Sequence, residues 1–257
     1  MYNICFYFIM FLFYAIFGWV MECIVCSINS KKFVHDRGFL IGPYCPIYGY
    51  GAMYMYFFLN RYYNDPIALF VMAMVGTSAL EYFTSYFMEK IFKARWWDYS
   101  NVRFNLEGRI CLRNSIAFGI LGMAFVYILN PCFLSVIEKI PNTVLIVISC
   151  FCFIVFLTDN ILSFSIMSKL KKNLTSIRKD STSDIDKQVR KMLSNNKFYW
   201  RKLFNSFPKV KISLPSGEAI TNSIRKTLDS FDVLRKERKK RKKELKKELK
   251  GKKESSK

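Results

Sequence analysis

Long apolar runs constrain this chain more than any other feature of its sequence. They cover about residues 4–28, 39–60, 66–88, 110–137 and 143–167. A helix that crosses the hydrocarbon core of a bilayer needs roughly 20 mostly apolar residues. Because lipid offers no partners to backbone N–H and C=O groups, such crossings must be helical. The sequence therefore predicts an all-α, polytopic membrane protein with about five transmembrane helices.

Charge divides the chain into two unlike regions. Residues 1–167 contain 11 Lys and Arg and 9 Asp and Glu, whereas residues 168–257 contain 29 and 10. Such a split separates a region suited to lipid from a region suited to water. We therefore expect a transmembrane domain at 1–167 and a Lys/Arg-rich tail at 168–257.

The distribution of basic residues between the loops predicts the orientation. Nine Lys and Arg lie around 29–38 and 90–113, after the first and third predicted spans, whereas the alternate loops contain only Arg61 and Lys139. Basic residues near span ends concentrate on the cytoplasmic side. We expect the N-terminus outside the cell, the tail in the cytoplasm, and the plasma membrane as the location.

Several ionisable side chains lie within or beside the predicted spans. Each costs on the order of 3 kcal/mol in hydrocarbon, so each needs a partner or a function. All fall in the cytoplasmic half of the predicted bundle: Glu22, Glu81, Arg109, Arg113 and Asp159. We expect a polar cluster that faces the cytoplasm. It either fixes helix packing through ion pairs or forms a pathway for a substrate or ion, and its outermost members could instead lie at the headgroups.

Helical spacing places some of these polar residues on shared faces. Ser78, Glu81, Ser85 and Glu89 recur at intervals of three and four residues, which forms one polar stripe on the third predicted span. Arg109 and Arg113 are four residues apart and share a face of the next span. We therefore expect these two faces to meet.

Glycine and proline interrupt the second predicted span. Residues 37–51 read RGFLIGPYCPIYGYG, and the candidate residues of this broken-helix segment are Arg37, Gly38, Gly42, Pro43, Pro46 and Gly49. Irregular backbone at membrane depth requires protein or water around it, and broken helices often build transporter binding sites. Alternatively, the span simply begins at Pro43 or Pro46, because proline suits the first turn of a helix.

An aromatic motif follows the third predicted span. Trp96, Trp97, Asp98 and Tyr99 form a short run beside a membrane boundary. Tryptophan and tyrosine concentrate at that boundary, so we interpret the run as an interfacial aromatic motif. A ligand platform is the alternative interpretation.

Residues suited to metal or covalent chemistry are scarce. Cys23 and Cys26 form a C-x-x-C within an apolar run, but no second pair has zinc-site spacing. His35 is the single histidine and lies in a loop. We therefore expect no enzymatic activity, no metal and no cofactor.

The tail contains two distinct segments. Residues 189–207 mix aromatic and basic side chains, which is typical of an amphipathic helix on an anionic membrane surface. Residues 235–257 contain 14 Lys and Arg and 4 Glu, which predicts a charged helix or a disordered segment. We expect the tail to contact anionic lipid headgroups, with a protein partner as the alternative. No recognisable nucleic-acid-binding module accompanies the charge.

Several of these motifs, in this order, resemble the putative ABC-transporter type IV family of CmpB-like bacterial membrane proteins. They are Phe17-Gly18-Trp19 with Glu22, the run at 37–51, Leu80-Glu81-Tyr82 with Thr84-Ser85, WWDYS at 96–100, and Gly108-Arg109-Ile110-Cys111-Leu112. The resemblance covers roughly residues 5–165. It implies a multi-pass bacterial membrane protein that acts as a transporter permease.

Two partners follow from this resemblance. The sequence has no G-x-x-x-x-G-K-[ST] phosphate-binding loop, so an ATPase would be a separate subunit that docks on loops 29–38 or 90–108. Five spans are few for a translocation path, which favours a homo-oligomer or a larger membrane complex. The alternative function is a membrane scaffold or accessory protein that does not transport and whose basic tail binds lipid or protein partners.

Overall fold

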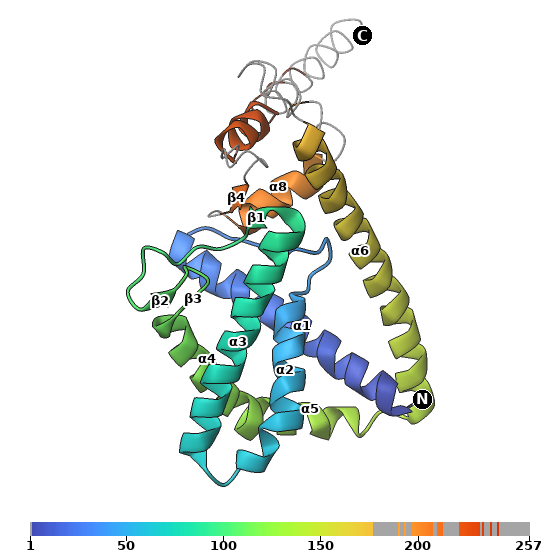
Figure 1. Cartoon of the computed structure of the whole chain (residues 1–257). Coiled ribbons are helices and arrows are strands. Elements are labelled where there is room, and N and C mark those ends of the chain that lie inside the picture. Colours follow the sequence, from blue (N-terminus) through green and yellow to red (C-terminus); the bar gives the residue numbers. More distant parts are fainter. Residues whose placement is uncertain are drawn as a thin grey trace, which may run out of the picture.

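Long helices form a bundle in this structure, a computed structural model, and the tail packs against one end of it (Figure 1). The structure describes residues 2–176, 190, 193, 197–207, 210–212, 221–231, 233, 237 and 241. Among these residues, 4 helical stretches are long and apolar enough to cross a membrane: α1 (Tyr2–Ser30), α3 (Pro66–Phe92), Leu112–Ile137, and Asn142–Lys169 within α6 (Asn142–Ser176). They match four of the five predicted spans, so the chain is a multi-pass membrane protein.

The second predicted span differs from the structure. Its helix, α2 (Pro46–Phe58), has 13 residues, and residues 39–45 before it are not helical. At about 1.5 Å per residue the helix is roughly 20 Å long, less than the hydrocarbon thickness of about 30 Å. Helix length therefore does not establish a fifth span. Among the two predicted starting points, the helix begins at Pro46.

The turn between α2 and α3 contains the short 3-10 helix η1 (Asn60–Tyr62). Asp65 caps the start of α3, since its side chain accepts the amide hydrogen of Ala68 at 3.0 Å. At the other end, Lys93 adopts a left-handed conformation with φ 55°, which terminates α3. These two ends fix the position of the polar face of α3.

The fourth span is composite. It contains α4 (Leu112–Ala124), the π-helical segment η2 (Phe125–Leu129) and α5 (Asn130–Ile137). Pro131 cannot donate a backbone hydrogen bond and its ring crowds the preceding turn, so the wider π-turn before it accommodates the proline. The span bends, and α5 lies across the end of the bundle opposite to the tail (Figure 1).

Two short antiparallel strand pairs shape the end of the bundle that contacts the tail. In the loop between α3 and α4, β2 (Asn105–Leu106) pairs with β3 (Ile110–Cys111). In the same loop, β1 (Ala94–Arg95) pairs with β4 (Lys211–Ile212) of the tail, with Ala94 opposite Ile212. The second pairing joins the tail directly to the span-connecting loop.

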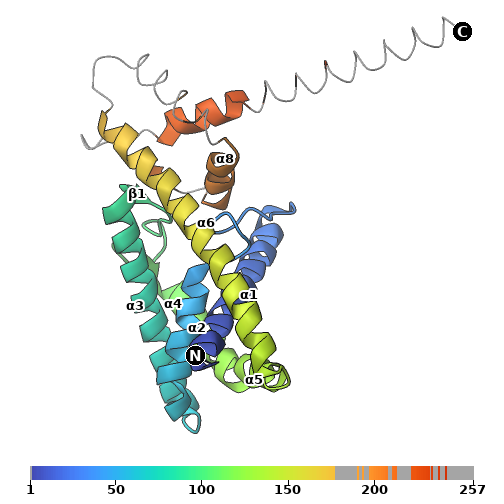
Figure 2. The same cartoon turned by 90° about the vertical axis from the view of Figure 1, so that its right-hand side faces the viewer.

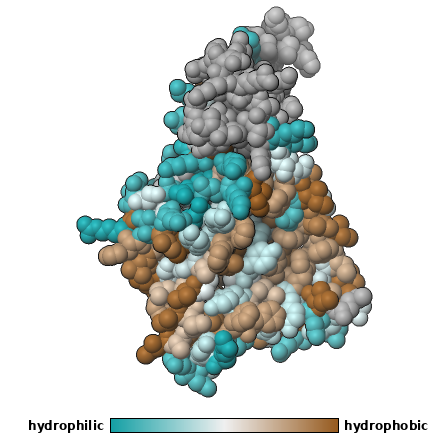
Figure 3. All heavy atoms as spheres, viewed as in Figure 1, coloured by the Kyte–Doolittle hydropathy of each residue, from teal (hydrophilic) through white to brown (hydrophobic). Residues whose placement is uncertain are grey.

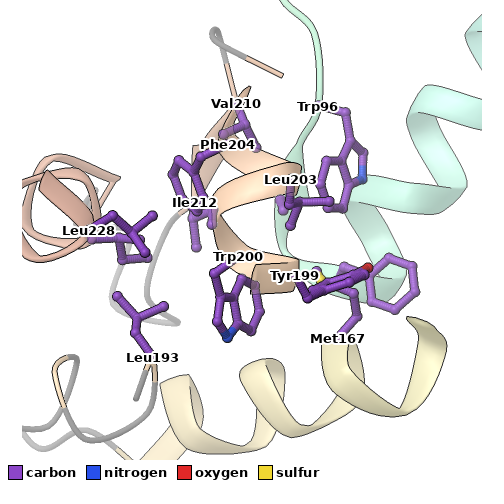
Figure 4. Close-up of a cluster of buried hydrophobic side chains, with 13 residues drawn as sticks. Trp96, Met167, Leu193, Tyr199, Trp200, Leu203, Phe204, Val210, Ile212 and Leu228 are labelled. Atoms are coloured by element: carbon purple, nitrogen blue, oxygen red, sulfur yellow. The ribbon is translucent and has the colours of Figure 1, made fainter. Parts of the chain in front are cut away.

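The tail forms a folded unit, called here the tail cap, which contains α8 (Lys197–Ser206), β4 and the helical residues 221–231. Its core also includes residues from the bundle (Figure 4). The buried members are Phe92, Ala94, Trp96, Met167, Leu193, Tyr199, Trp200, Leu203, Phe204, Val210, Ile212, Ile224 and Leu228. The apolar face of α8, which we expected on a lipid surface, is therefore buried within the protein itself.

The boundary between bundle and tail is continuous. α6 passes residue 167 without a break, and its 35 residues give a length of about 50 Å. It crosses the face of the bundle and reaches the tail cap (Figure 2).

Figure 3 shows hydrophobic residues over the helical part of one face and hydrophilic residues towards the tail. The charged segment predicted at 235–257 lies outside the described residues, except for Glu237 and Arg241, which are helical.

Candidate functional site

The ionisable residues predicted to form one cluster separate into four polar groups. Glu22 pairs with Arg37, Glu81 contacts Tyr99, and Asp159 binds backbone amides of residues 41 and 42. Arg109, in the loop after α3, forms ion pairs with Glu89 of α3 and with Glu107 of the same loop. Arg113 is exposed and has no ion pair among the described residues. The single cluster is therefore wrong in its pairings, because loop and tail residues supply most of the partners.

Glu22 lies at the junction of α1, α2 and the loop between them. Its carboxylate accepts hydrogen bonds from the Arg37 guanidinium at 2.8 Å and from the Tyr48 hydroxyl at 2.7 Å. The side chain of Arg37 is 15% exposed, so the pair is shielded from water more than a surface ion pair. The Arg37 guanidinium also donates to the carbonyl of Ser206 in α8. This ion pair thus connects α1 to the tail cap.

Gly18 explains why Tyr48 reaches Glu22. A Cβ atom at Gly18 would overlap the Tyr48 ring, which lies across this position of α1. Gly18 and Glu22 are four residues apart and share a helical face. The glycine therefore leaves room for the aromatic ring whose hydroxyl binds the carboxylate one turn further along the helix.

Asp159 organises the irregular backbone before α2. Its carboxylate accepts the amide hydrogens of Ile41 at 3.0 Å and Gly42 at 2.6 Å, and the hydroxyl of Ser163 at 2.9 Å. The Tyr44 hydroxyl also donates to it. Asp159 is therefore a backbone-binding residue of the loop.

Lys202 binds the same backbone from the tail side. Its ammonium group donates to the carbonyl oxygens of Leu40, of Ile41 at 2.6 Å and of Gly42 at 3.4 Å. Lys202 is 7% exposed. Burial lowers its pKa, whereas the negative charge of Asp159 acts in the opposite direction. The loop carbonyls therefore solvate this buried ammonium in place of water.

The predicted broken-helix segment is thus irregular backbone surrounded by protein groups. Gly38 has φ 84°, a left-handed conformation that favours glycine. Gly42 and the residues before it bind Asp159 and Lys202, Pro43 lies in the non-helical stretch, and Pro46 starts α2. Gly49 lies inside α2 and is buried. The helix starts at Pro46, and the irregular backbone that precedes it remains a predicted element of a binding site.

Glu81 differs from Glu22 and Asp159 in its hydrogen-bond partners. Its Oε1 atom accepts the hydroxyl of Tyr99 at 3.2 Å, whereas Oε2 is buried and has no hydrogen-bond partner among the described residues. No cationic side chain of the described residues forms an ion pair with it, and the residue is 6% exposed. A buried ion without a counter-charge costs several kcal/mol, more than the roughly 1–3 kcal/mol of an unpaired neutral group.

Arg109 binds the polar stripe of α3 at its end near the tail. It forms ion pairs with Glu89 at 2.8 Å and Glu107 at 3.4 Å, and donates to the Ser85 hydroxyl at 3.3 Å. The hydrogen bond from Tyr82, and then the contacts of Arg109, hold the pKa of Glu107 below its ordinary value. Further along the stripe, Ser78 donates to Ser115 of α4 at 2.7 Å. Ser78 thus joins the α3 stripe to α4, but the contact does not involve the predicted face of Arg109 and Arg113, because Arg109 precedes α4 and Arg113 is exposed.

The aromatic motif is a junction inside the protein. Trp96 is 1% exposed and packs against Phe207 of the tail. The indole of Trp97 donates to the carbonyl of Arg109 at 3.0 Å, and Asp98 accepts Lys211 at 2.5 Å. The loop folds these side chains inwards against the bundle and the tail cap, and their position at a membrane boundary stays a prediction.

Gly108 allows the two halves of this loop to lie close together. It has φ 66°, and a Cβ atom there would come within 2.7 Å of the Asp98 carboxylate. The Tyr99 amide donates to the Gly108 carbonyl at 2.8 Å. The motifs at 96–100 and 108–112, apart in the sequence, are therefore neighbours in space.

Two functional side chains were missed at the level of sequence. Tyr48 gave no signal, since it is one aromatic residue among many in its span. Lys202 is one of many basic residues in the tail, so its special position was overlooked. Positions 199, 202, 203 and 206 follow the spacing of one helical face, and residues 199, 203 and 206 are buried. A lysine on the apolar face of an amphipathic helix indicates a buried ammonium with specific acceptors.

Comparison with known proteins gives one match. Residues 9–164 match a family model described as putative ABC-transporter type IV. The matched region begins in α1 and ends in α6, so it contains Glu22, Glu81, Arg109 and Asp159, whereas Lys202 lies beyond it. No curated protein and no solved structure matches the chain.

Proposed function

The chain belongs to the putative ABC-transporter type IV family, and we propose that it is the permease subunit of a transporter whose ATPase is a separate chain. The absence of a phosphate-binding loop from the sequence supports a separate ATPase. In this proposal the chain itself catalyses no reaction. The substrate would be recognised by the membrane domain.

One observation carries this proposal: charged side chains and irregular backbone meet inside the helical bundle. Glu22, Glu81 and Asp159 come from different spans, and the 31–45 loop reaches two of them. Non-helical backbone at membrane depth is tolerated where protein groups satisfy it, and transporters use such segments around their sites. Asp159 and Lys202 provide those protein groups here.

We place the N-terminus outside the cell and the tail in the cytoplasm. The basic loops 29–38 and 90–113 lie at the tail end of the bundle (Figure 1), which supports this orientation in the plasma membrane. In this arrangement α2 and the loop before it together complete a fifth crossing. A reporter enzyme that is active only outside the cell should be active when fused after residue 62 or 140 and inactive when fused after residue 100. A reporter that is active only in the cytoplasm should give the reverse result.

The ATPase would dock on the loops at the tail end. Phe33 is 88% exposed, Phe104 is 79% exposed and Leu106 is 56% exposed, all in loops between spans. Exposed apolar side chains in polar loops are typical anchors of a protein interface. The chain would act as a homo-oligomer or within a larger membrane complex, with the exposed apolar residues of α6 against lipid or a second subunit.

Purification of the tagged protein from its own host in mild detergent, followed by mass spectrometry, tests the proposal. We expect a stoichiometric ATPase that is lost in Phe104→Ser and in Phe33→Ser. Tyr63→Ser alters an exposed aromatic residue at the opposite end and should keep the ATPase. Recovery of the chain with non-ATPase envelope proteins alone would contradict the proposal.

A membrane scaffold is the second candidate function. The tail cap supports it, because the described part of the tail is folded onto the bundle through an apolar core and a strand pairing. Charge neutralisation of Glu81 distinguishes the two functions, since a permease should lose flux while its complex persists. Deletion of residues 235–257 also distinguishes the two functions. A scaffold should lose the lipid or protein partners that its tail recruits, whereas a permease should keep its flux.

A further inference from the structure

The unpartnered oxygen of Glu81 lies where neighbouring side chains offer hydroxyl groups and no cation. Oε2 is inaccessible to solvent, and the described residues give it no hydrogen bond. Oε1 has one contact, the Tyr99 hydroxyl at 3.2 Å. Two other carboxylates of the spans, the half-buried Glu22 and the buried Asp159, have several donors each.

The charged groups of the elements packed around Glu81 are either paired with other residues or exposed. From α1, Glu22 is within electrostatic range, but it pairs with Arg37. From α2, the Tyr48 hydroxyl donates to Glu22. From the loop after α3, Arg109 pairs with Glu89 and Glu107. From α4, Ser115 binds Ser78, and Arg113 is exposed.

We propose that Glu81 is a proton-binding site: in this structure a proton occupies Oε2, and its release creates a carboxylate that binds the Tyr99 hydroxyl more strongly. A buried carboxylate without a counter-charge is unfavourable, so a cation must neutralise it. A metal ion requires several ligands around it, whereas the described residues contain no group of three or more His, Cys, Asp or Glu side chains that could hold one. A proton needs no such coordination shell.

Tyr99 transmits the protonation state of Glu81 to the tail cap. A hydrogen bond to an ionised acceptor is about twice as strong as a bond between neutral groups, so proton release draws Tyr99 towards α3. Tyr99 follows Asp98, which binds Lys211 of the tail cap. The inference concerns proton binding alone and does not depend on the transport function proposed above.

Infrared spectroscopy of the full-length protein in liposomes tests the site. A protonated carboxylic acid has a carbonyl band separate from that of a carboxylate, and exchange into heavy water shifts it. We expect this band at neutral pH in the native protein and its loss in Glu81→Gln. Glu138→Gln, an exposed carboxyl group at the opposite end, should retain it. Absence of the band from the native protein, or its loss in Asp159→Asn instead, would overturn the proposal.

A second variant keeps the test informative if Glu81→Gln fails to fold. Tyr99→Phe removes the donor that favours the ionised carboxylate, so the band should persist to higher pH than in the native protein. The protection of residues 94–111 against hydrogen exchange, taken relative to the unfolded chain at the same pH, should increase with rising pH in the native protein and lose that dependence in Tyr99→Phe. An unchanged titration of the band in Tyr99→Phe would also overturn the proposal.

Discussion

Asp159 and Lys202 bind opposite sides of one backbone segment. The Asp159 carboxylate accepts amide hydrogens from Ile41 and Gly42, at 3.0 and 2.6 Å, and the Lys202 ammonium donates to the carbonyls of Leu40, Ile41 and Gly42. The peptide dipoles therefore point from the cation to the anion. Each charge is solvated by backbone, so a loop of irregular structure has a defined conformation.

Removal of the Lys202 charge should release the tail cap from the loop. Lys202→Met preserves much of the side-chain length and leaves three backbone carbonyls without their donor. We expect the free energy of unfolding in detergent to fall by about 2 kcal/mol, the range for hydrogen bonds to charged groups. Lys226→Met, an exposed lysine of the tail cap, is the control and should change stability little. Equal effects of both variants would contradict this prediction.

The effects of Asp159 and Lys202 should be coupled. Asp159→Asn removes a charge that binds the same loop, so either single variant already disorders the segment that the other residue contacts. The double variant should lose about 1 kcal/mol less stability than the sum of the single variants. Lys202→Met combined with Glu138→Gln, which is distant, should be additive. Strict additivity in the first pair would show that the loop does not couple them.

A side chain at Gly18 should disrupt the Glu22 site. In Gly18→Ala the new methyl group overlaps the Tyr48 ring, and we expect a loss of about 1–3 kcal/mol because the packed bundle cannot relax freely. Gly51 is the matched control, since its Cβ would lie 3.9 Å from Leu80, an ordinary contact. Gly51→Ala should be neutral or stabilise the helix by up to about 1 kcal/mol. Thermal unfolding in detergent compares the two.

The contact between the loop after α3 and the tail cap should weaken in acid. The hydrogen bond from Lys211, and then that from Ser100, hold the pKa of Asp98 well below its ordinary value of 3.8. A depressed pKa in the folded state contributes stability that is complete above the unfolded-state value and is lost as the pH falls below it. The protection of residues 210–212 against hydrogen exchange, taken relative to the unfolded chain at the same pH, should therefore fall below about pH 4.

Asp98→Asn checks the origin of that acid effect. The variant cannot titrate, so exchange at 210–212 should be faster at neutral pH and should lose its acid dependence. Asp229→Asn, an exposed carboxylate of the tail cap, should preserve the native pH profile. The same acid dependence in Asp98→Asn would assign the effect to another group.

Four spans could be predicted from the sequence because each is a long apolar run, and length and hydropathy are local properties. Pro46 marked the start of α2 for a similar local reason. The pairing of polar residues was not local: the helix face of Glu81 was predicted, yet its partner Tyr99 comes from a loop that folds back. Several carboxylates and guanidinium groups were available at similar depth, so charge alone could not select the pairs.

In the tail, too, the sequence predicted local structure but not the tertiary partner. The amphipathic pattern of α8 predicted a buried apolar face, but it could not distinguish lipid from the bundle as the surface that buries it. Trp96 was expected at a membrane boundary for the same reason and instead packs against Phe207. An apolar face predicts burial, whereas the partner depends on the tertiary structure.

The contact of Lys202 with Leu40 also sets an order of biogenesis. The two residues are 162 positions apart, and the ribosome synthesises the chain from its N-terminus. The loop before α2 therefore emerges long before the residue that binds its carbonyls, and α6 must be inserted before Asp159 can bind its amides. The earliest irregular segment of the bundle reaches its final conformation only when synthesis has passed the last span and entered the tail.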